Sequence, residues 1–306
     1  MTQLSIIFLG TSGSWPTMKR NVTSIAIKRA GEVILFDCGE GTQRQFQKSK
    51  LSYMQISKIF ITHFHGDHFL GLPGLIQTMQ LNDRDIPLHI YGPKGMVKLV
   101  SQILSLGYFK PSFQIFSYDL NPGDTVKFEE YYIHILKVKH GIPAFAYCLE
   151  EKMRPGKFDK SKALKLGIPE GPLFSKLQRG ENIVLDNGKK IFSKSVLGPP
   201  RKGRKIVISG DTVPIKDMIN FAKDADILIH EATFDSSLEE ISNEYGHTTA
   251  SQAAHIAKKA KVERLYLTHI SPRYLNGDTL EKEAKKIFKN SFVSKDFQDV
   301  EVKLKK

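Results

Sequence analysis

Short apolar runs alternate with stretches of helical periodicity along most of the chain. Apolar runs bounded by turn residues predict buried strands, and apolar positions that recur every three or four residues predict amphipathic helices. Their alternation is typical of an α/β architecture. The predicted strands are residues 4–9, 33–36, 59–62, 88–91, 132–138, 145–149, 205–209, 227–230 and 264–268. The predicted helices are residues 42–48, 71–80, 94–106, 214–222, 249–259 and 279–289.

Two of the predicted strands share a local sequence. Residues 58–63 read KIFITH and residues 264–269 read RLYLTH, so each is an apolar run that ends in Thr-His. In α/β sheets, ligands bind outside the carboxyl ends of the strands. The repetition predicts two similar halves whose strand ends face one site, although two short buried strands can also resemble each other by chance.

Residues 153–203 interrupt this pattern with closely spaced turn-forming pairs such as Pro155-Gly156, Gly171-Pro172 and Asn187-Gly188. We therefore predict that residues 1–150 and 205–306 form the two halves of one body, and that residues 151–204 form an inserted arm. The alternative is an ordinary surface loop. A structureless stretch of that length inside a compact domain is usually functional or mobile, which favours the arm.

Charge is concentrated in the same segment. The chain carries a net charge of +13, and residues 151–205 contain fifteen Lys and Arg against five Asp and Glu, a net of +10. A local excess of this size is typical of a surface that contacts a polyanion, although a charge run is more often a solvated face. We expect this segment to contact nucleic acid or phosphate.

Length and composition narrow the class of protein. The 306 residues are enough for one large domain or two modest ones, and a hydrophobic content of 41% is ordinary for a soluble globular protein. No apolar stretch approaches the roughly 20 residues that span a bilayer, and the N-terminus lacks the basic start of a signal peptide. Two cysteines, Cys38 and Cys148, give no disulfide framework. We expect a cytoplasmic protein with no membrane association.

The stretch HFHGDH at residues 63–68 indicates a metal site. It places His63, His65, Asp67 and His68 directly after a predicted strand, and imidazole and carboxylate groups are preferred ligands of zinc. Gly66 suits the tight turn that would let these side chains converge. The alternatives are a histidine-rich surface loop, or a helix start capped by Asp67, but this spacing of four donors is rare outside metal sites.

Three more donors follow predicted strands: His140, Asp211 and His269. Together the seven groups could hold two zinc ions. His63, His65 and His140 would bind one ion. Asp67, His68 and His269 would bind the other, and Asp211 would bridge them. Two metal ions roughly 3.5 to 4 Å apart can lower the pKa of a bound water toward about 7 and stabilise the attacking and leaving oxygens of a displacement at phosphorus.

Acid and base roles follow from the remaining polar residues near strand ends. Asp67 is placed to orient or deprotonate the attacking water. His247 could act as the general acid, with Glu231 fixing its tautomer and charge. A plainer interpretation makes His247 or Thr248 a helix cap and Glu231 a surface acid, and spacing alone does not separate the two. Asp37 in FDCGEGTQ is expected to orient a ligand histidine or its loop.

The motifs resemble those of the metallo-β-lactamase superfamily of hydrolases, and most closely those of the ribonuclease Z family, the transfer-RNA 3′-processing endonucleases. The resemblance spans essentially the whole chain. HEATF and GHTTA are the parts specific to this family, and the basic insertion is similar to the family's flexible arm. The motifs that carry it are FLGTSG, PTMKRN, FDCGEGTQ, ITHFHGDH, GLPGL, YGPKG, VKHG, SGDT, HEATF, GHTTA and LTHISPRY.

The resemblance implies a fold, an activity and partners. The fold would be an αββα sandwich carrying the flexible basic arm. His63, His65, His140 and Asp211 would bind one Zn²⁺, and Asp67, His68, Asp211 and His269 the other, with Asp67 as base and Glu231 and His247 assisting the leaving group. The enzyme would cut precursor transfer RNA 3′ to the discriminator nucleotide, leaving a 3′-hydroxyl. It would be a homodimer whose arm from one subunit grips the RNA that the other subunit cuts.

Candidate RNA contacts lie outside the metal cluster, in the loop of residues 15–21, in the arm and after the last Thr-His strand. They are Lys19, Arg20, Gly171, Pro172, Lys176 and Arg273. Phe64, within the histidine cluster, could pack in the core or touch a base.

Other functions remain possible from the sequence. Hydrolases of thioesters, lactams, sulfate esters or cyclic phosphodiesters could use the same two-metal site, but a small neutral ester gains nothing from an arm of net charge +10. A nucleic-acid-binding protein with structural metals is a different class. Histidine and carboxylate ligands in place of a closed all-cysteine set argue against it.

Overall fold

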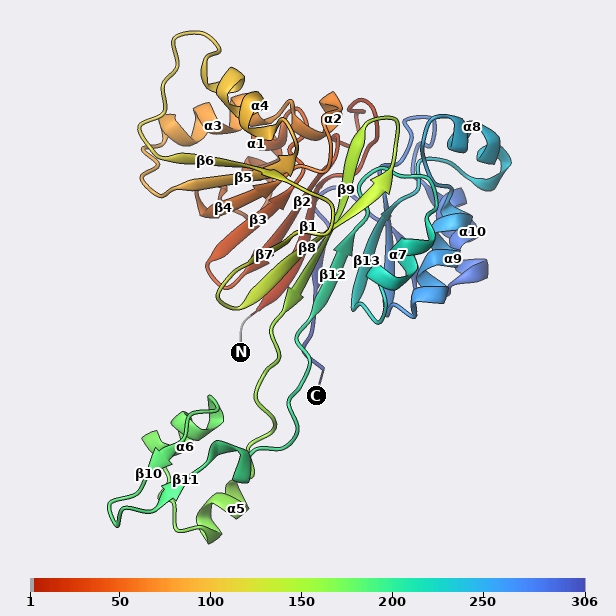
Figure 1. Ribbon diagram of the computed structural model, residues 1–306. Helices are drawn as coiled ribbons and strands as arrows, with labels where there is room; N and C mark the ends of the chain where they lie inside the picture. The colour runs from red at the N-terminus through yellow and green to blue at the C-terminus, as the bar shows by residue number, and fades with distance from the viewer. Residues whose placement is uncertain (1–2, 306) are drawn as a thin grey trace.

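The computed structural model describes residues 3–305 and contains two large β-sheets packed face to face, with helices on both outer faces (Figure 1). This four-layer arrangement confirms the predicted αββα sandwich. A smaller unit projects from one end of the sandwich on two extended segments (Figure 1). Within the described residues, no helix is both long and apolar enough to cross a membrane.

The first sheet has the strand order β16-β1-β2-β3-β4-β5-β6. Strands β3 to β6 run parallel to one another, whereas β1, β2 and β16 are antiparallel to their neighbours. Its strands are β1 (Leu4–Gly10), β2 (Ser24–Arg29), β3 (Glu32–Phe36), β4 (Ile56–Phe60), β5 (Leu88–Pro93), β6 (Ile115–Leu120) and β16 (Asp299–Glu301).

The second sheet has the order β15-β14-β13-β12-β9-β8-β7. Its strands β12 to β15 are parallel, and β7, β8 and β9 form an antiparallel group. The strands are β7 (Thr125–Lys127), β8 (Tyr131–Lys139), β9 (Pro143–Glu151), β12 (Lys205–Ile208), β13 (Ile227–Glu231), β14 (Arg264–Thr268) and β15 (Ser291–Val293). The predicted halves do not coincide with the sheets, because the strands predicted at residues 132–138 and 145–149 of the first half lie in the second sheet as β8 and β9.

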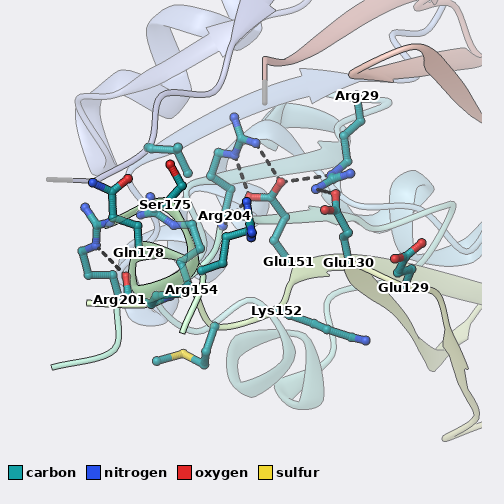
Figure 2. A pocket seen from close by; sticks show the side chains of 14 residues that line it. Arg29, Glu129, Glu130, Glu151, Lys152, Arg154, Ser175, Gln178, Arg201 and Arg204 are labelled. Atoms are coloured by element: carbon teal, nitrogen blue, oxygen red, sulfur yellow. Dashed lines mark hydrogen bonds and ion pairs between the residues drawn. The ribbon is translucent and has the colours of Figure 1, made fainter. Parts of the chain in front are cut away.

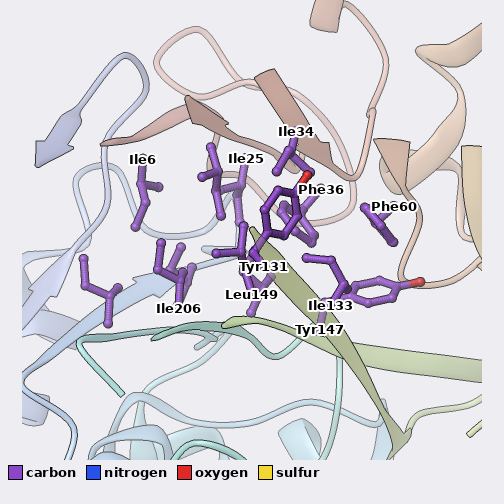
Figure 3. Packing of buried hydrophobic residues seen from close by; sticks show 14 of the residues in the cluster. Ile6, Ile25, Ile34, Phe36, Phe60, Tyr131, Ile133, Tyr147, Leu149 and Ile206 are labelled. Carbon is purple, nitrogen blue, oxygen red and sulfur yellow. The ribbon is translucent and has the colours of Figure 1, made fainter. Parts of the chain in front are cut away.

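Strand periodicity divides the apolar side chains between two layers of core. In β1, Leu4, Ile6 and Phe8 point into the layer between the sheets, and Ile7 and Leu9 point toward the helices. Figure 3 shows the layer between the sheets, where aromatic and branched side chains from both sheets interdigitate. Strands buried on both faces read as continuous apolar runs, which is why the sequence signalled them strongly.

Helices close the two outer faces. On the first sheet these are α1 (Thr42–Lys48), α3 (Leu72–Leu81) and α4 (Met96–Leu104), and on the second they are α7 (Lys216–Phe221), α9 (Ala250–Ala260) and α10 (Asp278–Ile287). All six match predicted helices. Helix α9 begins at a capping box in which the Thr249 side chain accepts from the backbone N–H of Gln252 and the Gln252 side chain accepts from that of Thr249. The plainer interpretation, in which Thr248 or His247 caps this helix, is therefore wrong, because Thr249 is the cap.

The projecting unit lies between the end of β9 at Glu151 and the start of β12 at Lys205. It has a small apolar core of its own, to which Phe174, Leu177 and Ile191 contribute. Its elements are α5 (Lys160–Lys165), α6 (Pro172–Gln178), β10 (Ile183–Val184) and β11 (Lys190–Ile191). We call this unit the arm, and the two segments that join it to the body, residues 152–158 and 197–204, the neck.

Candidate metal centre and active site

All seven predicted donors converge outside the carboxyl ends of the parallel strands in the two sheets. His63, His65, Asp67 and His68 follow β4, the last two on the short helix α2 (Gly66–Phe69). The others come from the second sheet: His140 follows β8, Asp211 follows β12 and His269 follows β14. Their ligand atoms form groups within 4.8 Å of one another, drawn from both sheets.

The first group contains three imidazoles. His65 Nδ1 lies 3.1 Å from His63 Nε2 and 3.1 Å from His140 Nε2. Three nitrogens bound tetrahedrally to one zinc at about 2.0 to 2.1 Å would be separated by about 3.3 Å. The spacing of this group is therefore close to what zinc requires.

The second group contains Asp67, His68 and His269. His269 Nε2 lies 3.2 Å from Asp67 Oδ2, and His68 Nε2 lies 3.6 Å from the same oxygen. The backbone N–H of Ser14 also donates to Asp67 Oδ2 at 2.7 Å, which fixes the carboxylate. These separations again bracket the value expected for ligands of one ion.

Asp211 lies between the two groups. Its Oδ2 is 3.7 Å from His63 Nε2, 3.4 Å from His68 Nε2 and 3.1 Å from His269 Nε2. A single carboxylate oxygen is thus within ligand spacing of both groups. Such an atom can bridge two cations.

Hydrogen bonds on the outer nitrogens orient the rings of His63 and His68. His68 Nδ1 donates to Asp37 Oδ2 at 2.7 Å, as expected for a residue that orients a ligand. The Thr62 hydroxyl donates to the same carboxylate at 2.9 Å and is left to accept from His63 Nδ1 at 3.0 Å. Both histidines therefore carry a hydrogen on Nδ1, and each Nε2, the atom that would bind a metal, points into the site.

His140 and His269 are oriented in the same way by different partners. His140 Nδ1 donates to the Gly246 carbonyl at 2.9 Å. Thr233 Oγ1 donates to Glu231 Oε2 at 2.8 Å and accepts from His269 Nδ1 at 2.9 Å. The Nε2 atoms of four histidines therefore face one small volume.

This arrangement fits metal ions. His68 Nε2 is completely buried and has no hydrogen-bond partner among the described residues. A buried polar atom without a partner is costly, and clustered ligand atoms about 3 Å apart are stabilised when a cation lies between them. The donor set of five histidines and two carboxylates suits two zinc ions.

The electrostatics of the metal-free site keep its carboxylates charged. Burial alone would raise the pKa of Asp67 and Asp211, but neighbouring histidines outweigh it and hold both pKa values well below the ordinary range. For His63, burial and the charge of His68 depress the pKa, so its ring stays neutral. Burial opposes charge on His68 as well, but Asp211 and Asp37 raise its pKa, so metal binding would release a proton there.

His247 and Glu231 form a buried pair beside the ligands. His247 Nδ1 lies 2.9 Å from Glu231 Oε1, and the side chain of Glu231 is only 1% exposed. Burial lowers the pKa of His247, but the charge and hydrogen bond of Glu231 outweigh it and raise the pKa to about 9. The pair corresponds to the predicted acid and its orienting carboxylate, and a surface position for Glu231 is excluded.

The loop of residues 15–21 gives one correction. Lys19 is exposed, but Arg20 is only 7% exposed. Its guanidinium donates to Thr11 Oγ1 at 2.6 Å and to the carbonyls of Ser294 and Asn276 at 2.6 and 3.2 Å. The prediction that Arg20 contacts RNA is therefore wrong, because its side chain is used inside the fold.

The other candidate RNA contacts remain accessible. Gly171 and Pro172, at the start of α6, are exposed, as is Lys176 one turn later. Arg273 is exposed beside the metal centre and lies over the ring of Phe234, 4.9 Å from its centroid. Phe64 is half-buried and packs with the apolar cluster beneath α3 and α4.

Sequence reasoning missed the groups that orient the ligands. Thr62 and Thr233 act through their hydroxyls. Gly246 and Ser14 act through backbone atoms, which every residue type carries and which therefore leave no signal in the sequence. The only available signal was the Thr that precedes His in each repeated strand. That signal misleads in one case, because Thr268 Oγ1 has no hydrogen-bond partner among residues 3–305.

Comparison with known proteins assigns the chain to a family. The family model described as Anti-Pycsar protein Apyc1 matches residues 4–153, and that of the Beta-lactamase superfamily domain matches residues 188–270. Ribonuclease Z of Methanosarcina acetivorans is 47% identical over 300 residues, covering 98% of both chains. Ribonuclease Z of Pyrococcus horikoshii is 45% identical over 299 residues, covering 98% of this chain and 96% of the relative.

Solved structures agree with this assignment. The short form of human tRNase Z superposes with a TM-score of 0.72 at 29% identity, covering 97% of this chain and 98% of its own. The long-form RNase Z from yeast superposes with a TM-score of 0.68 at 19% identity, covering 97% of this chain and 42% of its own, and shows the fold alone. Full-length identity above 40% to curated relatives, together with the shared fold, places the chain in the ribonuclease Z family of the metallo-β-lactamase superfamily.

Proposed function

We propose that this protein is a zinc-dependent endoribonuclease that removes 3′ trailers from precursor transfer RNAs. It cleaves 3′ to the discriminator nucleotide and leaves a 3′-hydroxyl on the transfer RNA. Curated relatives named Ribonuclease Z and the human tRNase Z structure support the reaction and the substrate class.

One observation carries the two-metal part of this proposal. Asp211 Oδ2 lies within 3.7 Å of ligand nitrogens in both groups, and each group by itself has the spacing of zinc ligands. His63, His65, His140 and Asp211 would hold one ion, and Asp67, His68, Asp211 and His269 the other. Two bound ions would supply Lewis acidity at phosphorus and a water acidic enough to attack at neutral pH.

Asp67 is the proposed base. The backbone N–H of Ser14 and His269 Nε2 both contact its Oδ2, so that oxygen is fixed at the centre of the site. Its low pKa keeps the carboxylate charged at neutral pH. Oδ1 would then be available to accept a hydrogen bond from the attacking water and to orient it toward phosphorus.

His247 is the proposed acid. Attack at phosphorus breaks the bond from phosphorus to O3′ of the discriminator nucleotide, and O3′ must gain a proton to become the 3′-hydroxyl. Glu231 holds His247 Nδ1 and raises its pKa, which leaves Nε2–H charged and free to donate that proton. The phosphate stays on the 5′ end of the trailer.

We also propose that the enzyme acts in the cytoplasm as a homodimer whose arms grip the transfer RNA cut by the partner subunit. The two cysteines are free and buried, which suits a reducing compartment. The arm leaves the body where Lys205 pairs with Glu150, at the ends of β9 and β12 that lie away from the metal centre. An arm directed away from its own site is better placed to serve another.

The decisive experiment combines metal content with product mapping. Wild-type protein should bind two zinc ions per chain and cut a labelled precursor transfer RNA at one position. H140A should retain one ion and lose cleavage, whereas H255A, which removes an exposed histidine from α9, should match the wild type. Full cleavage by H140A, or a product end inside the trailer, would contradict the proposal.

For the dimer, the test mixes two inactive variants. One lacks residues 155–198, and the other carries D67N. If arms act on the partner's site, mixed dimers regain cleavage, because the subunit with an intact site receives the arm of the other. Failure of the mixture, with dimers demonstrated by light scattering, would exclude the exchange.

A further inference from the structure

The neck of the arm places two arginines directly opposite each other. The backbone N–H of Arg154 donates to the carbonyl of Arg201 at 2.8 Å, and that of Arg201 donates to the carbonyl of Arg154 at 2.9 Å. The two residues form an isolated antiparallel bridge, so their side chains lie on the same side of the neck. Like charges in this position destabilise a strand pair.

Glu151 offsets the charge of this pair only in part. Among residues 3–305, neither guanidinium forms an ion pair. Arg154 donates only to the carbonyls of Lys202 and Lys305, and Arg201 Nε donates to the carbonyl of Pro155 at 3.2 Å. Burial and the charge of Arg201 both lower the pKa of Arg154, which indicates that the two positive charges oppose each other.

The pair faces a pocket of about 780 Å³ between the arm and the body (Figure 2). Helix α6 contributes Ser175 and Gln178 to its wall and Arg179 follows at its C-cap; Figure 2 shows Ser175 and Gln178 beside Arg201. Polar donors from the arm and from the neck thus line one hollow. A ligand in it would touch both parts at once.

Two acidic residues of the pocket, Glu151 and Glu130, already have cationic partners. Glu151 accepts from Arg204 at 2.7 and 2.8 Å and from Arg29 at 3.1 Å, and Glu130 pairs with Arg29 at 2.7 Å. The remaining carboxylate, Glu129, lies at the far side of the pocket from Arg201 (Figure 2). The uncompensated charge near α6 is therefore positive.

We propose that this pocket is a phosphate-binding site in which Arg154 and Arg201 clamp one phosphate group. Arginine forks match the oxygens of phosphate and bind them by paired, charge-assisted hydrogen bonds. The phosphate belongs either to an RNA backbone or to a free phosphate compound. A bound phosphate would relieve the repulsion across the neck and tie the arm to the body, and so reduce the freedom of the arm.

The site is tested first with inorganic phosphate on the zinc-loaded full-length protein. Calorimetric titration should detect, apart from phosphate bound at the two zinc ions, one binding event that R154Q/R201Q loses, whereas K189Q/K190Q, which removes the same charge at the tip of the arm, retains it. R201E should also abolish it, because its carboxylate supplies Arg154 with a partner inside the chain. Equal phosphate binding by wild type and R154Q/R201Q would overturn the proposal.

A second experiment, with RNA, then assigns the source of the phosphate. This experiment rests on the proposed function. If the occupant is an RNA phosphate, R154Q/R201Q binds precursor transfer RNA more weakly, and the slope of log affinity against log salt falls by roughly 1 to 2. If affinity and slope are unchanged while phosphate binding is lost, the occupant is a free phosphate compound. Hydrolysis of bis(p-nitrophenyl) phosphate and zinc content should stay at wild-type levels in both cases, which separates failure of this site from failure of the metal centre.

Discussion

Replacing Glu231 by glutamine tests the acid role of His247 most directly. Glu231 Oε1 lies 2.9 Å from His247 Nδ1, and its carboxylate also accepts from the backbone N–H of Thr212 at 3.0 Å and the hydroxyl of Thr233 at 2.8 Å. The amide of E231Q keeps an acceptor oxygen of similar shape but removes the negative charge. The substitution therefore changes electrostatics more than packing.

The magnitude follows from the pKa of His247. Its rise from 6.5 to about 9 corresponds to about 3 kcal/mol in favour of the charged ring. Burial opposes that charge and Asp211 favours it, so without Glu231 the pKa should fall back toward the ordinary value of 6.5. At pH 7.5 the protonated fraction then drops from nearly all to about one tenth. Cleavage of RNA should slow by about tenfold.

Two measurements check this prediction. Proton NMR of the metal-free protein should show His247 titrating near pH 9 in the wild type and at least two pH units lower in E231Q. The second compares leaving groups: p-nitrophenolate needs no proton, so E231Q should hydrolyse bis(p-nitrophenyl) phosphate within about threefold of the wild type. Equal losses on both substrates, with zinc content intact, would refute the acid role.

Other predictions follow from the same structure. T62V removes the hydroxyl between Asp37 and His63 and should weaken zinc binding by about 10- to 100-fold in chelator competition. Zinc binding should weaken as pH falls, because the raised pKa of His68 lets a proton compete with the metal there, and equilibrium dialysis across pH would measure this. R20Q should lower the melting temperature, whereas K19Q should weaken RNA binding and leave melting unchanged; the reverse result would restore Arg20 as an RNA contact. Deleting residues 155–198 should weaken precursor binding and spare bis(p-nitrophenyl) phosphate hydrolysis; equal loss of both would contradict a role for the arm in RNA binding.

Most of the long buried strands could be predicted because each carries its own signal, but the six-residue strands β2 and β6 were missed. Strands β4 and β14 are apolar runs that any neighbours would have to cover, and both were expected from the sequence. The short strands β7, β15 and β16 have three residues each and were missed. Strand β16 exists because of a partner far away in the chain, since it pairs with β1 across nearly the whole sequence. Such pairing leaves little trace in the local pattern.

The metal ligands of the site could be predicted from the sequence, but most of the residues that orient these ligands by hydrogen bonds could not. A ligand must be a particular residue type, so histidines and aspartates at strand ends could be recognised. The supports depend on three-dimensional position: Asp37 reaches His68 from a backbone with φ of 58°, and Gly246 offers only a carbonyl. The Thr-His repeat predicted equivalent halves, yet Thr62 supports a ligand and Thr268 does not. Thr233, from the neighbouring strand exit, takes that role for His269.

The geometry of the second sheet constrains how the arm and the metal centre can act on one RNA. Strand β8 ends at Lys139, next to His140 in the metal centre, and begins at Tyr131, which pairs with Glu151 at the root of the arm. Eight residue steps at about 3.4 Å place these two ends about 27 Å apart, with the arm extending further still. Buried ion pairs from Glu151 to Arg204 fix the root of the arm. If one subunit both gripped and cut an RNA, that RNA would have to reach along the whole body from the arm to the metal centre. A two-fold dimer can instead bring the partner's arm beside the metal centre. The mixed-dimer experiment is therefore the measurement that tests whether the arm of one subunit serves the metal centre of the other.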